Sequence, residues 1–378
     1  MRILQVNHLL DAVTGGGTAE RTLQISRLLA NAGIECTVLS LDIGMDAARR
    51  REFDSVRIVA LPCLLRRFFV PRLSWRRLKS EVEAAHVIHI MGHWTLLNAL
   101  VFLAARSAGR PYVICPAGAL PIVGRSRLLK QLYNFLIGRR LVRQASGHIA
   151  ITASEIPDFS AYGVAPEKVV VIPNGAPAAA SHGRGCADFL ARHGLAHRKF
   201  VLFLGRLAYI KGPDLLLEAF AGAATRLPEL DLVYAGPDGG MLSELRQQSV
   251  RLGMQARVHF VGYVGGADKA CALQFCELLA IPSRQEAMSI VALEAGVHRK
   301  PVLLTDRCGF SEVERAGGGR IASATSASIE STLVRMASDP GELARMGERL
   351  EAYVSEHYTW RQSVTKHLAL YSRLAGGH

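Results

Sequence analysis

The sequence predicts an α/β fold divided into two domains. Short apolar runs alternate along the chain with stretches in which apolar residues recur at helical spacing, a pattern typical of parallel sheets covered by helices. With 378 residues, 49% of them hydrophobic, the chain is longer than one typical domain. We expect domains at residues 1–175 and 199–355, a linker region at 176–198 that begins rich in Ala, Gly, Ser and His, and a last helix within 356–378 that packs back on the first domain.

Eleven apolar runs fit buried parallel strands. They are Arg2–Asn7, Thr37–Leu41, Arg57–Ala60, Val87–Ile90, Tyr112–Cys115 and Val169–Ile172 in the first domain, and Phe200–Leu204, Asp231–Ala235, Val258–Val261, Glu277–Ile281 and Pro301–Thr305 in the second. Ligands of open α/β sheets bind beyond the carboxyl ends of the strands. The turns that follow these runs therefore hold the candidate site residues.

Three glycines follow the first strand and precede a helical run from about Thr18 to Gly33. Gly16 and Gly17, with Gly15 before them, would let backbone amides approach an anion closely, although a plain turn explains them equally well. Glu20 falls one turn into this helix, where a carboxylate stabilises the positive helix end; the alternative is an acid that faces a ligand cleft. His93, after the fourth strand, is interpreted as a structural histidine, with sugar binding as the alternative.

A glycine-flanked turn between the strand Phe200–Leu204 and the next helix carries two cations. Arg206 and Lys211 lie five residues apart in this turn. A guanidinium fork and a mobile ammonium on one anion suit a diphosphate. Surface cations are common, but the strand, turn and helix around these two favour the functional interpretation.

The stretch Pro282–Glu294 is the other candidate corner. A strand leads into it, and apolar periodicity predicts a helix that begins near Glu286. On such a helix Glu286 and Glu294 would be separated by a rise of about 12 Å. That spacing is poor for a metal site or for an acid/base pair on one bond, but it suits a ligand with two hydroxylated ends.

The start of that helix offers a place for the negative middle of the same ligand. Backbone amides around Met288, Ser289 and Ile290 could hold a diphosphate, because helix N-termini carry unpaired N–H groups. The alternative is a glutamate that favours its own helix dipole and a second, solvated glutamate.

The charge and cysteine content bear on partners and location. A net charge of +13 implies attraction to an anionic partner, and two stretches, Leu64–Leu78 and residues 125–143, mix cations with bulky apolar groups as membrane-surface segments do; solvated helix faces are the alternative. No nucleic-acid module accompanies the charge. No apolar run is long enough to span a membrane, and the start lacks a signal peptide, so we expect a cytoplasmic protein, and the two basic stretches predict its association with the inner membrane face. Seven cysteines without CxxC spacing predict free thiols.

The order of these segments resembles family-4 retaining glycosyltransferases of the GT-B fold over nearly the whole chain. The resemblance is carried by Gly15–Glu20, Ile172–Gly175, Gly205–Arg206 with Lys211–Gly212, Ala235–Pro237, Phe260–Gly262, and Glu286 with Glu294 eight residues later. It implies two Rossmann-like domains facing across a cleft. The nucleotide diphosphate sugar, the donor substrate, would be held mainly by the second domain.

The resemblance also implies residue roles. Arg206 and Lys211 would bind the diphosphate, Glu294 the ribose and Glu286 the transferred sugar, while the backbone near Val264 would meet the base and Gly16–Gly17 would approach the phosphate. Such enzymes need no metal or other cofactor. A phosphate oxygen would accept the proton of the acceptor hydroxyl, or Glu20 would assist the acceptor.

The resemblance predicts a hexosyltransferase acting on a glycan or lipid-linked acceptor in surface polysaccharide biosynthesis. Two departures stand out: Ala287–Ser289 replaces the usual Gly-Phe-Gly, and Pro116–Gly118 lacks the His or Arg of many relatives. Two alternatives stay open, a sugar-nucleotide epimerase on the same scaffold and a non-catalytic binding subunit. Nucleic-acid binding is the least favoured function.

Overall fold

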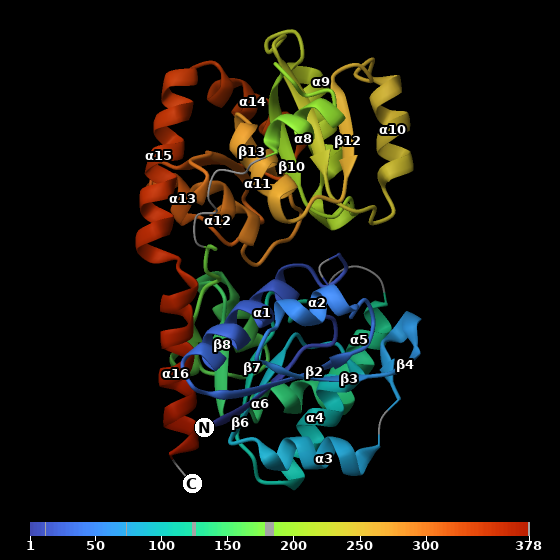
Figure 1. Cartoon of the computed structure of the whole chain (residues 1–378), viewed down its shortest axis with the longest axis vertical. Helices are drawn as coiled ribbons and strands as arrows, with labels where there is room; N and C mark the ends of the chain where they lie inside the picture. Colours follow the sequence, from blue (N-terminus) through green and yellow to red (C-terminus); the bar gives the residue numbers. More distant parts are fainter. Residues whose placement is uncertain (12, 73, 123–125, 178–184, 377–378) are drawn as a thin grey trace. The chain divides into compact units, whose positions relative to one another are not determined.

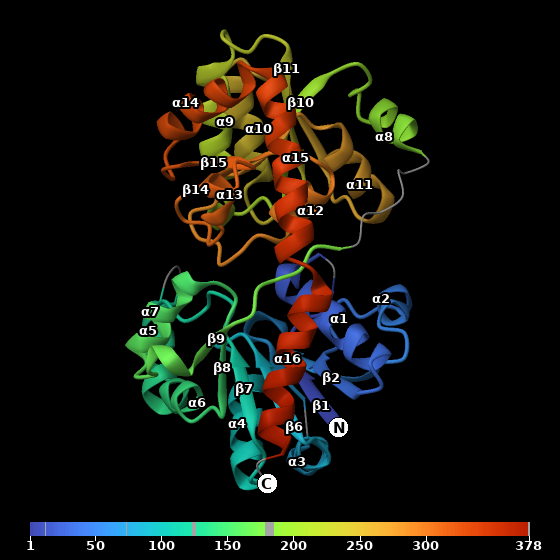
Figure 2. The same ribbon diagram turned by 90° about the vertical axis from the view of Figure 1, so that its left-hand side faces the viewer.

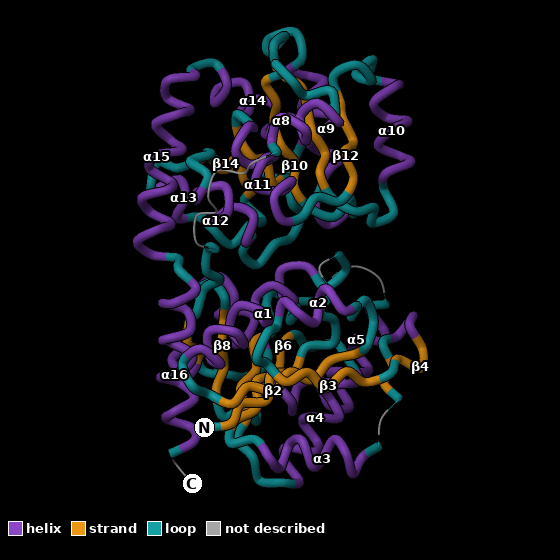
Figure 3. The backbone as a smooth tube through the Cα atoms, in the orientation of Figure 1, coloured by secondary structure: helices purple, strands orange, loops and turns teal. Residues whose placement is uncertain are grey.

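The computed structural model describes residues 1–11, 13–72, 74–122, 126–177 and 185–376. The chain forms two compact units, unit 1 with Met1–Asn174 and Trp360–His378, and unit 2 with Gly175–Thr359. Each unit contains a parallel sheet with helices on both faces (Figure 1), and the strands of each sheet run side by side between the helices (Figure 3). These are the two α/β units that the alternating pattern predicts.

The sheet of unit 1 has seven strands within the described residues. Their order is β3 (Arg57–Leu61), β2 (Glu35–Leu41), β1 (Arg2–Val6), β6 (Val87–Met91), β7 (Tyr112–Cys115), β8 (Gly147–Ala150) and β9 (Val169–Val171), and every neighbouring pair is parallel. Buried Val6, Ile90 and Ile114 are among the strand residues in the core. Strand order reverses between β1 and β6, which makes their carboxyl ends the switch point of this sheet.

Helices and short elements complete unit 1. They include α1 (Gly16–Asn31), α2 (Ala47–Glu52), the hairpin β4 (Cys63–Leu65) and β5 (Val70–Pro71), α3 (Trp75–Ala84), α4 (Leu96–Ser107), α5 (Arg127–Tyr133), the π-helix η2 (Asn134–Gly138), α6 (Arg139–Arg143), α7 (Ile156–Ala161) and α16 (Trp360–Ala375). Figure 2 shows α16 along the strands of this unit beside α1. The last helix of the chain is therefore part of unit 1.

A buried arginine on α1 joins the segments through which the chain leaves and re-enters unit 1. Arg21 is fully buried; its Nη1 donates to Asn174 Oδ1 at 2.9 Å and its Nη2 donates to the Ile172 carbonyl at 2.8 Å. The same Nη2 lies 3.4 Å from Nε2 of His367 on α16. Burial and the nearby guanidinium lower the pKa of His367 well below its usual range and that of His89 to about 3, so both imidazoles are neutral at pH 7.

The sheet of unit 2 has six strands among the residues described. Their order is β12 (Val258–Gly262), β11 (Leu230–Ala235), β10 (Lys199–Leu204), β13 (Leu278–Ile281), β14 (Val302–Thr305) and β15 (Gly319–Ala322), again all parallel. The helices are α8 (Cys186–Arg192), α9 (Pro213–Ala223), α10 (Leu242–Arg251), α11 (Gly266–Phe275), α12 (Ile290–Val297), α13 (Glu312–Arg315), α14 (Ser326–Ala337) and α15 (Pro340–His357). Phe220, Leu232 and Leu303 are among the core residues.

One expectation about the chain is corrected in this unit. Cys186 and Cys271 form a disulfide between α8 and α11, so the prediction of free thiols is wrong for this pair; Cys36, Cys63, Cys115, Cys276 and Cys308 are free. The partners are 85 residues apart, which no local spacing pattern reveals. The predicted linker 176–198 also includes helix α8, which packs on α11, while residues 178–184 lie outside the described residues.

None of the helices in the described ranges is long and apolar enough to cross a membrane.

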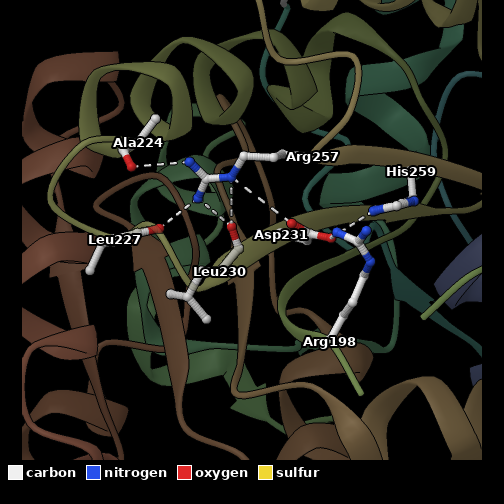
Figure 4. Close-up of polar contacts among 7 residues, drawn as sticks. All are labelled: Arg198, Ala224, Leu227, Leu230, Asp231, Arg257 and His259. Carbon is white, nitrogen blue, oxygen red and sulfur yellow. Dashed lines mark hydrogen bonds and ion pairs between the residues drawn. The ribbon is translucent and has the colours of Figure 1, made fainter. Parts of the chain in front are cut away.

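An ion network fastens the amino edge of the unit 2 sheet. Asp231, at the start of β11 and 4% exposed, accepts from Arg198 Nη1 at 2.6 Å and lies 2.8 Å from His259 Nε2 (Figure 4). Arg257 lies 3.9 Å from the other carboxylate oxygen and donates to backbone carbonyls that follow α9, those of Ala224, Leu227 and Leu230. One carboxylate thus joins the starts of β10, β11 and β12.

Close backbone approaches fix the opposite edge. A Cβ on Gly212, whose φ is +66°, would lie 2.0 Å from the Pro282 carbonyl oxygen, and one on Gly236 would lie 1.9 Å from the Gly205 oxygen. The turn before α9 therefore packs directly against the backbone that follows β13. Only glycine fits these two places.

Asp231→Asn should lower the free energy of unfolding of unit 2 by about 2 kcal/mol, because a neutral amide leaves Arg198 and Arg257 less well compensated in a partly buried site. Urea denaturation followed by circular dichroism measures the change. The control is Glu244→Gln on exposed α10, which should stay within about 0.5 kcal/mol of wild type. Equal stability of Asp231→Asn and wild type would show that the network does not contribute to the stability of unit 2.

Gly212→Ala should destabilise unit 2 more than Gly253→Ala does. Both glycines have positive φ, +66° and +69°, so each alanine brings a backbone strain of about 1 kcal/mol, but a Cβ at Gly253 meets nothing within 4 Å. The clash with Pro282 should add about 1–3 kcal/mol at Gly212 alone. Thermal unfolding of both variants measures the difference, and equal melting temperatures would contradict the close approach.

Candidate functional site

The switch point of the unit 2 sheet is the place where the candidate residues gather. Strand order reverses between β10 and β13, and ligands of such sheets bind beyond the carboxyl ends of the strands at this point. The turn 205–212 leaves β10 there, and the turn 282–289 leaves β13. Both predicted binding turns therefore lie at one edge of one sheet.

The first turn is held by backbone hydrogen bonds to the neighbouring strand end. Gly205 N donates to the Ala235 carbonyl at 2.9 Å, and Leu207 N donates to the Pro237 carbonyl at 2.9 Å. Between them the side chain of Arg206 is exposed. Gly239 packs on its stem, since a Cβ there would lie 2.7 Å from Arg206 Cγ. The turn thus presents the guanidinium to solvent on a fixed backbone.

The helix that follows the second turn begins later than the sequence predicts. Helix α12 begins at Ile290, with Ser289 as its N-cap, and not near Glu286. Glu286 N donates to the Arg307 carbonyl at 2.9 Å, and Gly309 N donates to the Glu286 carbonyl at 3.1 Å. Because its backbone pairs with the turn after β14, Glu286 is bridged to that turn and cannot begin a helix. The rise of about 12 Å along one helix does not apply to Glu286 and Glu294.

The predicted anion-binding amides do lie at a helix N-terminus. Met288, Ser289 and Ile290 are buried and lead into the first turn of α12. The Ser289 side chain makes no capping hydrogen bond to this helix. The first amides of a helix have no intrahelical partner and mark the positive end of its dipole. This end of α12 can therefore attract a negatively charged group.

Each of the two predicted glutamates is paired with a lysine. Lys211, at the end of the short 3₁₀ helix η5 (Tyr209–Lys211), donates through Nζ to Glu286 Oε2. Lys269 on α11 donates to Glu294 Oε1 at 2.6 Å. The structure thus brings Lys211 and Glu286 together from the two turns at the switch point, as a shared site requires.

Sequence reasoning missed the residue that braces these turns. Arg284 donates to both carboxylate oxygens of Asp214 at 2.8 and 2.6 Å, its backbone N donates to the Ile210 carbonyl, and its guanidinium lies 3.9 Å from the Tyr209 ring centre. The hydrogen bonds with Asp214 raise the pKa of Arg284. Arg284 and Asp214 are 70 positions apart, and no sequence pattern predicts that such distant residues form an ion pair.

Val264, which is expected to bind the base, lies in the connection between β12 and α11. Val264 is buried two residues after the end of β12, and Gly265 is the N-cap of α11. Lys269 lies in the first turn of that helix, with its side chain 35% exposed. The base contact of Val264 and the ribose contact of Glu294 stay predictions. Helix α11 does bring a lysine, Lys269, to Glu294.

The candidates of unit 1 lie at the start of α1, which begins at Gly16, two residues before the predicted start. Gly16 has a φ of +58°, and a Cβ on Gly15 would lie 2.6 Å from the Asp11 carbonyl oxygen. Glu20 Oε1 accepts from Gln24 Nε2 at 2.7 Å within the same helix. The anion role of Gly16 and Gly17 and the acceptor role of Glu20 stay predictions.

His93 has the structural role that the sequence favours. Its Nε2 lies 2.9 Å from Asn134 Oδ1, and Trp94, Tyr133 and Tyr162 surround its ring. Burial lowers the pKa of His93 to about 4, so the ring is neutral at pH 7. Over the described ranges, no three His, Cys, Asp or Glu side chains group as a possible metal site.

Two family models match the two units. One, described as a glycosyl transferase 4-like domain, matches residues 16–175, and another, described as glycosyl transferases group 1, matches residues 190–352.

Relatives with similar sequences include D-inositol 3-phosphate glycosyltransferases. The protein of Gordonia bronchialis is 30% identical over 249 residues, which cover 62% of this chain and 54% of the relative. That of Salinispora tropica is 26% identical over 331 residues, which cover 79% of this chain and 68% of the relative. The match thus spans about half the length of the first relative.

Similar solved structures cover almost the whole chain. HepE from Anabaena, in complex with UDP and glucose, has a TM-score of 0.83 at 20% identity and covers 99% of this chain and 100% of its own. Sucrose-phosphate synthase from Thermosynechococcus elongatus has a TM-score of 0.77 at 17% identity and covers both chains fully, 100% and 100%. WaaG, a glycosyltransferase involved in lipopolysaccharide biosynthesis, has a TM-score of 0.72 at 17% identity, covering 97% and 99%. Two matching family models and the shared fold show that this chain belongs to the family-4 glycosyltransferases of the GT-B fold.

Proposed function

We propose that this chain is a retaining hexosyltransferase that moves a sugar from a nucleoside diphosphate sugar to a hydroxyl of a glycan or lipid-linked acceptor, in surface polysaccharide biosynthesis. The observation that carries the proposal is the meeting of Lys211, Glu286 and the N-terminus of α12 at one switch point, with Arg206 on the same turn as Lys211. A UDP complex of HepE and the lipopolysaccharide role of WaaG agree with this assignment.

The reaction exchanges one bond at the anomeric carbon for another. The bond from that carbon to the β-phosphate oxygen breaks, and the bond to the acceptor oxygen forms on the same face. The acceptor proton goes to an oxygen of the departing diphosphate. Negative charge accumulates on the leaving group, where fixed cations and a helix N-terminus stabilise it most. We expect no metal requirement, because Arg206, Lys211 and α12 supply this compensation.

The Lys211–Glu286 pair prepares the site for its ligand. A buried or half-buried carboxylate is costly without a positive partner. In the free protein each side chain compensates the other. When a donor binds, Lys211 would donate to its diphosphate instead of to Glu286, and Glu286 would accept from its sugar hydroxyls instead of from Lys211. The pair therefore keeps both groups at the switch point before the ligand arrives.

Arg206→Ala should reduce turnover by about a hundredfold or more, because it removes one charge from the developing diphosphate. It should also abolish the thermal stabilisation that one of UDP, GDP or ADP gives to the wild type, since a ligand of the native state raises stability by mass action. Differential scanning fluorimetry and product analysis measure the two effects.

Arg251→Ala at the exposed end of α10 is the control and should behave as wild type. Near-normal activity of Arg206→Ala would remove the diphosphate assignment. The product also separates the alternatives: a glycoside supports the transferase, an isomerised donor without acceptor supports an epimerase, and binding without product supports a non-catalytic subunit.

We further propose that unit 1 rests on an anionic membrane surface at the inner face of the cytoplasmic membrane. Unit 1 contains 25 Lys and Arg against 12 Asp and Glu, whereas unit 2 contains 20 of each. The segment α5–η2–α6 exposes Leu128 to 82% and Phe135 to 81%, next to the basic residues Arg127, Lys130, Arg139, Arg140 and Arg143. Apolar groups beside cations are typical of membrane-surface helices.

Leu64, Phe68 and Trp75 are also exposed in the other basic stretch, Leu64–Leu78. Residues 73 and 123–125, which include Arg125, lie outside the described residues.

The double variant Leu128→Ser with Phe135→Ser should weaken binding to phosphatidylglycerol vesicles at least tenfold, because it removes two large apolar side chains from the interface.

Co-sedimentation at low salt measures this binding. The control is Val250→Ser, an exposed apolar residue of neutral unit 2, which should bind as wild type does. Failure of the wild type to sediment with anionic vesicles would contradict the membrane proposal and leave the transferase assignment untouched.

A further inference from the structure

Lys269, the lysine paired with the ribose candidate Glu294, has no role in the proposed reaction. Glu294 lies in the middle of α12 with its side chain 7% exposed, and its Oε1 accepts from Lys269 Nζ at 2.6 Å. We propose that Lys269 holds Glu294 in place and donates to the ribose hydroxyls beside it, and thereby makes the nucleoside end of the site selective for ribose over 2′-deoxyribose. This inference rests on the proposed function, which places a ribose at Glu294.

The location of Lys269 is unusual for a lysine with only a surface role. It lies in the first turn of α11, where the helix dipole favours acidic residues and opposes a cation. Asp268, its neighbour, follows that preference. The Lys269 side chain instead reaches Glu294 on another helix. The carboxylate of Glu294 therefore supplies the interaction that offsets the unfavourable helix position.

The pair has the chemistry that recognises a vicinal diol. A carboxylate only accepts hydrogen bonds and an ammonium only donates them, so Glu294 and Lys269 present an acceptor and a donor side by side. Each ribose hydroxyl can donate to the first and accept from the second. A 2′-deoxyribose lacks one hydroxyl and would leave polar atoms of the pair without their ligand contacts, a difference on which strong discrimination rests.

The helix that carries Lys269 is crosslinked to α8 close to this residue. Two positions after Lys269, Cys271 is joined to Cys186 on α8, and Cys271, Ala272 and Leu273 are buried. Before it, Gly265 and Gly266 connect α11 to Val264, the residue expected beside the base. A side chain that is 35% exposed on a crosslinked helix is both reachable by a ligand and held in place.

The test is isothermal titration calorimetry of the whole chain with a nucleoside diphosphate and its 2′-deoxy form. UDP with 2′-deoxy-UDP is the first pair, and GDP and ADP with their 2′-deoxy forms follow. The variants are Lys269→Met, Lys269→Arg and, as control, Lys199→Met at the exposed start of β10. Melting temperatures without ligand check that each variant is folded.

We expect the wild type and Lys199→Met to prefer the ribonucleotide. Lys269→Met should lose roughly tenfold in affinity for the ribonucleotide and little for the deoxynucleotide, so that the ratio falls toward one, and Lys269→Arg should restore part of it. An unchanged ratio in Lys269→Met, or an equal loss for both ligands, would overturn the role of Lys269 alone. A wild type that binds no nucleoside diphosphate would overturn the proposed function itself.

Discussion

The candidate site of unit 2 depends on one close backbone contact. The Gly212 backbone lies against the Pro282 carbonyl so tightly that a Cβ has no room, and this contact joins the turn after β10 to the turn after β13. Strand order makes β10 and β13 neighbours, and the contact converts neighbouring strand ends into neighbouring side chains. The meeting of Lys211 and Glu286 follows from it, since each lies within a few residues of the contact. Arg284 also links these segments, because it pairs with Asp214 at the start of α9 and donates to the Tyr209 and Ile210 carbonyls.

Charge compensation within the free protein is the second organising constraint. The two acidic residues expected to bind donor hydroxyls each have a lysine partner, one from η5 and one from α11. Such pairs let carboxylates stay largely buried at fixed positions without a ligand, at a cost that removal of one partner would reveal. Under the proposed function a donor would separate these opposite charges, because its diphosphate would replace the carboxylate for Lys211 and its hydroxyls would replace the ammonium for Glu286.

Local patterns in the sequence were enough to predict eleven of the thirteen parallel strands in the described residues, and the two site turns. The apolar runs at Phe200–Leu204 and Glu277–Ile281 correspond to β10 and β13 within one residue. Strands β8 and β15 were missed because Gly147–His148 and Gly319–Arg320 interrupt their apolar pattern. The helix start near Glu286 was wrong because a bridge to Cys308, 22 positions away, holds that backbone. Contacts between distant positions, such as Cys186 with Cys271 and Arg284 with Asp214, leave no local signal at all.

The basic composition has two explanations, binding of the nucleotide donor or of a broad anionic surface, and the distribution of charge between the two units distinguishes them. A net charge of +13 attracts an anion, but the sequence alone does not say which one. Unit 2, which holds the diphosphate candidates Arg206 and Lys211, has equal numbers of basic and acidic residues, so its net charge would not attract a diphosphate and only the placement of such cations would. The whole excess lies in unit 1. A nucleotide bound to unit 2 does not account for charges there, and exposed Leu128 and Phe135 among them favour a broad anionic surface over a small anion.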